Sequence, residues 1–145
     1  MGTSVAEGLR AKMVTASIGV ADSLTGWSIH IGKAPATPDT CIIIARTPGR
    51  DPDPKWLLDY PAYQIRVRGP KGNYAQTELK AEQVKDHFLG FTSEDVDGAR
   101  WVSITMPSDI SFIGYDENDR PSFVVNLQMI VEPPQTAQNA NREPI

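Results

Sequence analysis

The stretch RTPGRDPDPKWLLDYPAYQIRVRG, which runs from Arg46 to Gly69, organises the interpretation of this chain. Its first part contains four prolines. Pro48-Gly49 is typical of a turn, because proline fixes φ and glycine tolerates positive φ. Pro52 and Pro54 bias the aspartates before them toward extended conformations. The sequence therefore predicts a stiff, exposed, proline-rich loop over about 47–61.

The second part of the stretch predicts a strand. Apolar and polar side chains alternate from Tyr63 to Arg68, and successive side chains of a strand point to opposite faces. One face should therefore be apolar, and Arg66 and Arg68 should protrude on the other. Charge pairing with the acidic loop of a neighbouring subunit is favoured, because guanidinium groups bind carboxylates bidentately. A small nucleic-acid patch and a solvated strand face remain as alternatives.

Two helices are predicted on either side of this stretch. Ser4 and Glu7 form a capping-box pattern before the first helix, which extends toward Val20. The second helix runs from about Asn73 to Leu89 and is followed by a glycine placed to cap it. The apolar stripes consist of Val5, Leu9, Met13, Ala16 and Val20 in the first helix and Tyr74, Ala81, Val84 and Phe88 in the second. For the first helix, covering a sheet is favoured over a subunit contact.

Strands are predicted wherever alternating or β-branched runs end at turn residues. The predicted strands are 27–32, 41–45, 63–68, 101–104, 110–115 and 122–132. The run 41–45 is apolar throughout, which is typical of a strand covered on both faces. One of its faces should meet the helices, and the other could meet a neighbouring subunit. The last two strands should form a hairpin across 116–121, and 92–100 should be a loop.

These elements predict an α+β fold with one mixed, mainly antiparallel sheet of four to six strands and two helices packed on one face. A length of 145 residues suits a single domain. We expect this domain to cover residues 1–134. The segment 135–145 is rich in Gln, Asn and Pro, and we expect it to be a flexible tail unless a partner orders it.

Composition narrows the possible functions. The formal net charge is −4, which argues against a general nucleic-acid binder. The single cysteine, Cys41, excludes an internal disulfide framework and should be a buried thiol. The N-terminus lacks a signal-peptide pattern, and no apolar run approaches the ~20 residues of a transmembrane helix. We therefore expect a chain that is made in a cytoplasm and has no membrane partner.

No catalytic, cofactor or metal site is predicted. His30 and His87 lie on different predicted elements and form no zinc spacing with the lone cysteine. The acidic segments 94–98 and 116–119 do not complete a calcium loop. Glycine-rich and serine motifs of phosphate loops and hydrolases are also missing. A small enzyme or ligand-binding domain that uses the acidic loops for a metal remains the alternative from another class.

Three segments together carry a resemblance to a known family. The stretch 46–69, the segment ENDRPSF (117–123) and the C-terminal REPI (142–145) resemble the bacteriophage minor capsid and tail terminator family of long-tailed phages. The resemblance covers nearly the whole chain. It implies the same order of helix, strands, proline-rich loop, strand, second helix and a hairpin with a D-x-N-x-R-P turn.

The function that this resemblance implies is structural. Such subunits form a ring, typically hexameric, on the last ring of the tail tube, stop tube growth and offer a surface to the head connector or stopper. The partners would be other copies of the chain, the tail tube protein and the connector, while genomic DNA passes through without specific binding. The location would be the neck region of the virion tail. The nearer alternative is another neck component, such as a stopper or head-completion protein.

The candidate assembly residues come from the loop and the strand after it. Trp, Tyr and Arg side chains dominate the binding energy of protein interfaces. We therefore expect contacts at Trp56, Tyr60, Arg66 and Arg68, with Asp59 as a charged partner. Closing a ring requires one face to meet a different face, and the loop could supply one side.

Overall fold

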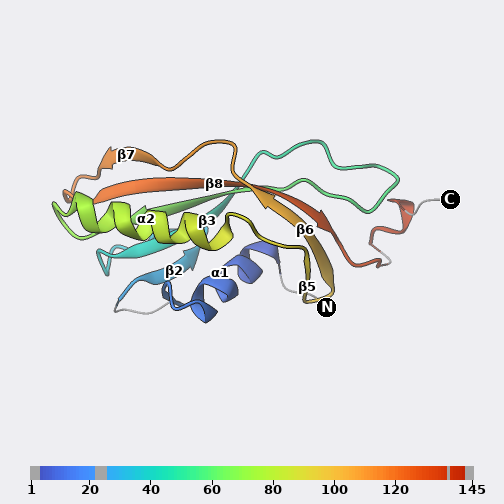
Figure 1. Ribbon diagram of the computed structural model, residues 1–145, viewed down its shortest axis with the longest axis horizontal. Coiled ribbons are helices and arrows are strands. Elements are labelled where there is room, and N and C mark those ends of the chain that lie inside the picture. The colour runs from blue at the N-terminus through green and yellow to red at the C-terminus, as the bar shows by residue number, and fades with distance from the viewer. Residues whose placement is uncertain (1–3, 22–25, 137, 143–145) are drawn as a thin grey trace.

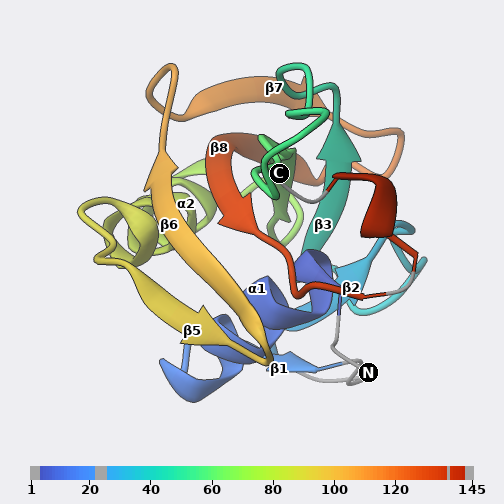
Figure 2. The same ribbon diagram turned by 90° about the vertical axis from the view of Figure 1, so that its right-hand side faces the viewer.

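The computed structural model describes residues 4–21, 26–136 and 138–142. The elements, in chain order, are α1 (Val5–Thr15), β1 (Val20–Ala21), β2 (Ser28–Ile31), β3 (Cys41–Thr47), β4 (Ala62–Arg68), α2 (Tyr74–Phe88), β5 (Glu94–Val96), β6 (Ala99–Thr105), β7 (Ser111–Tyr115), β8 (Pro121–Glu132) and the short 3-10 helix η1 (Ala140–Arg142). The α+β class is therefore confirmed. Figures 1 and 2 show a curled sheet with the two helices beside it.

The sheet is larger than predicted, with eight strands instead of four to six. Its order is β1-β2-β3-β4-β8-β6-β5, and β7 pairs with the other half of β8. The β1–β2 and β2–β3 pairs are parallel, whereas the remaining pairs are antiparallel. The predicted loop 92–100 is wrong in part, because it contains β5 and the start of β6. Asp97-Gly98 joins these two strands with positive φ at both residues, as tight hairpin turns require.

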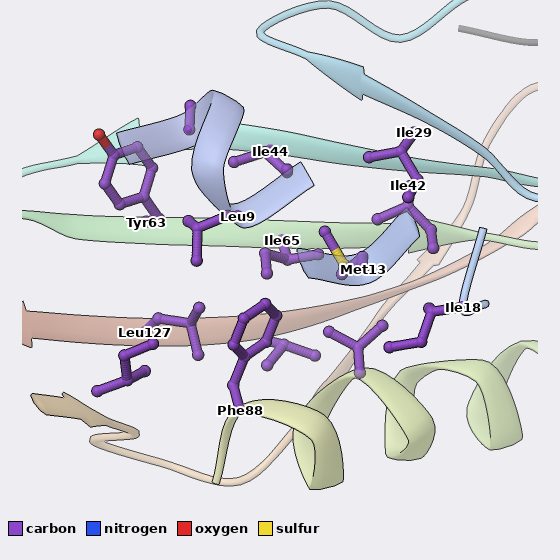
Figure 3. Packing of buried hydrophobic residues seen from close by; sticks show 14 of the residues in the cluster. Leu9, Met13, Ile18, Ile29, Ile42, Ile44, Tyr63, Ile65, Phe88 and Leu127 are labelled. Carbon is purple, nitrogen blue, oxygen red and sulfur yellow. The ribbon is translucent and has the colours of Figure 1, made fainter. Parts of the chain in front are cut away.

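Both helices pack on the same face of the sheet, as predicted. Leu9 and Met13 of α1 and Phe88 of α2 are fully buried among the apolar side chains of the central strands, as Figure 3 shows. The strand residues of this cluster include Ile42, Ile44, Ile65, Val67, Phe123, Val125 and Leu127. Burial of apolar area from all these elements is the main source of stability.

The first helix is shorter than predicted. The capping box is present, with Ser4 Oγ accepting from the Glu7 amide and Glu7 Oε1 accepting from the Ser4 amide. The helix ends at Thr15, because Ser17 adopts a positive φ of 60° and the chain reverses there. The predicted apolar stripe is therefore wrong at its end: Ala16 is exposed, and Val20 belongs to the edge strand β1.

The second helix follows the prediction closely. Asn73 caps its start by accepting from the Gln76 amide, and Gly90 follows its end with a φ of 78°. Ala81, Val84 and Phe88 are fully buried, as predicted. Thr77 takes the buried position one turn earlier, and Tyr74 stays partly exposed near β7.

The central strand β3 is covered on both faces, as its continuous apolar run predicts. Ile42 and Ile44 face the helices, while Cys41 and Ile43 are buried on the second face. This second face needs no neighbouring subunit for its burial. The chain itself supplies the cover, because Cys41 and Ile43 are at most 4% exposed in the single chain.

The predicted hairpin is confirmed, with β7 and β8 within one residue of the expected bounds. Asp116 forms its turn by accepting from the amides of Asn118 and Arg120. The Arg120 guanidinium binds the Asp116 carboxylate and also the carbonyl of Ala36. The acidic segment 116–119 thus has a structural explanation as a hairpin turn.

Candidate assembly surface

The segment 48–61 between β3 and β4, which we call the arm, extends beyond the end of the sheet (Figure 1). Its two sides are joined by backbone hydrogen bonds from the Arg50 amide to the Tyr60 carbonyl and from the Asp53 amide to the Leu58 carbonyl, both 3.1 Å. The arm is therefore a narrow hairpin-like extension instead of an irregular loop. Its prolines restrict the unfolded chain and so lower the entropy lost when the arm is ordered.

Trp56 lies at the tip of the arm. The Asp53 carboxylate accepts from the amides of Lys55 and Trp56 at 3.2 and 3.3 Å and so fixes the tip as a tight turn. Trp56 is 57% exposed, more than any other exposed aromatic residue of the chain. The structure thus exposes this candidate residue, and its role in assembly stays a prediction.

The base of the arm is held by backbone pairing with β8 and by a cation–π contact. Asp59 and Val131 exchange backbone hydrogen bonds of 2.8 and 2.9 Å. Arg50 lies over the ring of Tyr60, with its Cζ 4.5 Å from the ring centroid. Tyr60 is only partly exposed. The base is therefore fixed to the sheet, whereas the Trp56 side chain at the tip stays exposed.

The C-terminal segment contributes an unpredicted contact with the arm. The Arg142 guanidinium donates to the carbonyls of Asp53 and Leu58 and forms an ion pair with Asp59, with an Nη2–Oδ1 distance of 2.6 Å. This ion pair raises the pKa of Arg142. The predicted boundary between the domain and the tail stays a prediction. However, we expected that only a partner would order the tail, and the contact of Arg142 with the arm was not predicted.

The prediction that Arg68 protrudes from the sheet is wrong. Arg68 is 5% exposed, and its guanidinium donates to the carbonyls of Pro35, Pro38 and Asp39 at 2.7–3.0 Å. Burial lowers its pKa. The alternation placed Arg68 on the correct face of β4, but the loop between β2 and β3 folds over that end of the face.

Arg66 lies on the same face and is partly exposed. Its Nε is buried and has no hydrogen-bond partner among the residues that the structure describes. In the sheet it lies opposite Ile43 of β3 and Val124 of β8. Arg66 and Arg68 therefore do not form one exposed cationic surface, although a contact through Arg66 stays a prediction.

A second exposed apolar surface lies on β7, which pairs with the sheet on one side only. Phe112, Ile113 and Tyr115 are 40–53% exposed. Phe112 packs edge-on against Tyr74 of α2 with a centroid distance of 4.9 Å. We call these four residues the β7 surface. Unprotected edge strands and apolar patches of this kind are common at protein contacts. Sequence analysis placed the strand correctly but could not show that it forms an edge.

An open groove of about 900 Å³ separates α1 from the segment 87–97. Phe91 and Val96 contribute apolar lining, and Leu89 at the groove is 55% exposed. Lys12 forms an ion pair with Glu94, and its Nζ lies 5.4 Å from the centre of the Phe91 ring. Burial of the Lys12 side chain lowers its pKa. Burial and the charge of Lys12 lower the pKa of His87, which also lines the groove.

His30 and Cys41, considered in the sequence as possible ligands, have local structural roles. His30 bonds to Ser28, with 2.7 Å between Nε2 and Oγ, and Cys41 is buried, which raises its pKa. In the described part of the chain, no group of three His, Cys, Asp or Glu residues is arranged to bind a metal ion. Within those same residues, no helix combines the length and the apolar character needed to cross a membrane.

Comparisons with known proteins give one family and one similar fold. The family described as bacteriophage tail terminator protein matches residues 13–133. One solved structure, whose name states neither an activity nor a partner, superposes with a TM-score of 0.55 and 16% sequence identity. The match covers 93% of this chain and 100% of that chain. At this identity the likeness concerns the fold alone. The search of curated proteins gave no match.

Proposed function

Because this chain belongs to the bacteriophage tail terminator family, we propose that it forms a hexameric ring that caps the tail tube, stops its growth and joins the tail to the head connector. Membership of this family implies a structural role in the virion tail. The observation that carries the proposal is the family match over residues 13–133, which includes the arm, both strands around it and the β7–β8 hairpin.

The architecture supports assembly more than chemistry. The open groove beside α1 is lined mainly by apolar, small and acidic residues, and the acidic segments form hairpins. By contrast, two apolar surfaces are exposed at different places, the arm tip and the β7 surface. A ring needs contacts between two different faces of each subunit. Exposed aromatic side chains on fixed backbone are suited to such contacts.

The net charge of the chain should make ring formation depend on concentration or on a tail tube. Each copy carries a formal charge of −4, so six copies carry 6 × −4 = −24. Copies therefore repel one another before short-range contacts form, and salt weakens this repulsion. We expect the isolated chain to be a monomer at low concentration. Ring formation should require high concentration or the end of a tail tube, which aligns the copies.

Sedimentation of the isolated chain, followed by electron microscopy with tail tubes of the same phage, tests this proposal. We expect a monomer in dilute solution, a species of six copies at high concentration and a ring of the chain at one end of each tube. A stable two-fold dimer without tube binding would contradict the proposal. Binding to the head vertex without binding to tubes would instead identify a different neck component.

A further inference from the structure

Resting on the proposed ring, we infer that the arm of one copy docks in the groove of the next copy, with Trp56 against the groove's apolar residues and Lys55 against its carboxylates. The groove is the space defined above between α1 and the segment 87–97. The contact would be heterologous, since the arm and the groove are different surfaces of the same chain.

The shape of the two surfaces fits this contact. The arm ends in one large, exposed side chain, Trp56, on a turn fixed by Asp53. The groove has a volume of about 900 Å³, which lies within the range of about 300–1,000 Å³ found for pockets that enclose small ligands. Leu89 and Phe91 offer apolar contact there, and Leu89 is 55% exposed in the single chain.

The charges of the two surfaces are complementary. Four carboxylates line the groove, from Glu7, Glu94, Asp95 and Asp97, against one lysine, Lys12. Lys12 is already paired with Glu94 and Asp95 with Arg100, so four carboxylates face two cations. The lowered pKa of His87 favours a neutral ring. The groove therefore has an excess of negative charge, which attracts a cationic side chain.

The arm tip supplies such a side chain. Lys55 is exposed directly beside Trp56. Two of the arm's three aspartates are engaged within the chain, since Asp53 accepts from backbone amides and Asp59 pairs with Arg142. The tip thus presents an indole flanked by an ammonium group, and this pair matches the apolar and acidic lining of the groove.

The positions of the two surfaces allow one copy to reach the next. In Figure 2, the arm lies at the top of the molecule and β5, at the edge of the groove, lies at the lower left. The two surfaces therefore lie on different sides of the chain. A contact between the arm of one copy and the groove of another leaves the pair with one free groove and one free arm, on different copies, and a closed ring fills all of them.

Cross-linking between two variants, each with one added cysteine, tests this inference. Leu57→Cys places a thiol beside Trp56 without removing it, and Thr92→Cys places an exposed thiol in the groove. Cys41 is buried and should not react. We expect a short bismaleimide to join the two variants when they are mixed under ring-forming conditions. The matched control, Leu57→Cys mixed with Ser111→Cys on the exposed edge strand β7, should give little product.

Charge reversal tests the proposed role of Lys55. Lys55→Glu should lower the yield of the cross-link about fivefold, which is the scale of one exposed ion pair. Adding Asp95→Lys in the groove variant, which also releases Arg100 from its ion pair with Asp95, should restore most of the yield. Sedimentation of the same samples distinguishes a failure of the docking inference from a failure of the proposed function. Rings without the Leu57–Thr92 cross-link, or with the Ser111 product instead, would overturn the docking inference alone. A lack of rings and tube binding would overturn the proposed function as well.

Discussion

At the scale of single residues, Arg68 shows how one side chain can connect distant segments. Its guanidinium binds the carbonyls of Pro35, Pro38 and Asp39 from a position on β4. Arginine suits this task because it carries five N–H donors in a fixed planar group. Arg68 therefore contributes to the fold of the chain and not to an exposed cationic surface.

Replacing Arg68 should consequently reduce stability. In Arg68→Met, three carbonyl acceptors of partly buried residues lose their donor, at a net cost of about 1 kcal/mol for each hydrogen bond. We expect a loss of about 3 kcal/mol and, for a chain of this size, a fall in melting temperature of about 10 °C. Arg66→Met, at the partly exposed neighbour, should change the melting temperature much less. Equal stability of the two variants in thermal melting would show that the Arg68 contacts contribute little.

Arg142 acts on the arm in a comparable way. Its guanidinium contacts the carbonyls of Asp53 and Leu58 and the carboxylate of Asp59. Arg142→Ala should loosen the arm while leaving the core intact, because none of these contacts involves the apolar cluster. Hydrogen exchange at the amides of Asp53 and Leu58 should become about tenfold faster, which corresponds to about 1.4 kcal/mol of local stability.

A lysine at position 142 provides the control for this prediction. Arg142→Lys keeps the charge but replaces the planar guanidinium by a compact ammonium group, which cannot contact the same set of oxygens. We therefore expect an exchange rate between those of the unchanged chain and Arg142→Ala. Unchanged exchange in Arg142→Ala would mean that the backbone pairs at Arg50–Tyr60 and Asp53–Leu58 suffice to hold the arm.

At the scale of elements, the arm and the sheet contribute differently. The sheet buries apolar side chains on the face that carries the helices, whereas the arm leaves its largest side chain exposed. The arm is fixed at its base by the Asp59–Val131 bridge. A projecting segment that is ordered before binding loses less entropy on docking. This is the physical reason for proposing that the arm carries assembly contacts.

Trp56→Ala distinguishes a role of Trp56 in the core from a role in an assembly contact. The variant should melt within about 1 °C of the unchanged chain, because a side chain that is 57% exposed contributes little to the core. The same variant should fail to cap tail tubes efficiently, so that tails seen by electron microscopy become longer or unstable. If the variant unfolds, Trp56 belongs to the core after all. Normal melting with normal tail lengths would assign the contact to another surface, such as the β7 surface.

Sequence patterns predicted the elements that depend on local chemistry. The capping box at Ser4, the cap at Asn73 and the alternation in β8 determined these elements from neighbouring residues alone. The end of α1 was missed because the chain reverses at Ser17 with a positive φ, which serine rarely adopts. The short strands β1 and β5 were missed because their pairing, and not their composition, makes them strands.

The candidate surface was predictable only in part, for a similar reason. Exposure of Trp56 followed from its place in a proline-rich loop. Burial of Arg68 could not be predicted, because it depends on a loop about 30 residues away in the sequence. The contact of Arg142 with the arm spans more than 80 residues. A lone arginine in a polar segment gave no signal of such a contact, although the arm's aspartates were visible as possible partners.

At the scale of the whole molecule, the acidic net charge determines how the ring should treat DNA. A ring of six copies would carry −24 by the same arithmetic, and Arg68 and Arg120 are buried against the chain's own carbonyls. DNA phosphates bind proteins mainly through exposed cations. We expect little binding of duplex DNA in a gel-shift assay, even at low salt. Tight binding that weakens steeply with salt would instead identify exposed residues such as Arg66 as DNA contacts.

The most direct test of the central claim is the length of tails made with and without this chain. In the phage that encodes it, disruption of the gene should give tubes of variable and excessive length without heads, as seen by electron microscopy. Supplying the intact chain should restore a single tail length and the junction to heads. Tails of normal, uniform length that still join heads in the absence of the chain would contradict the account.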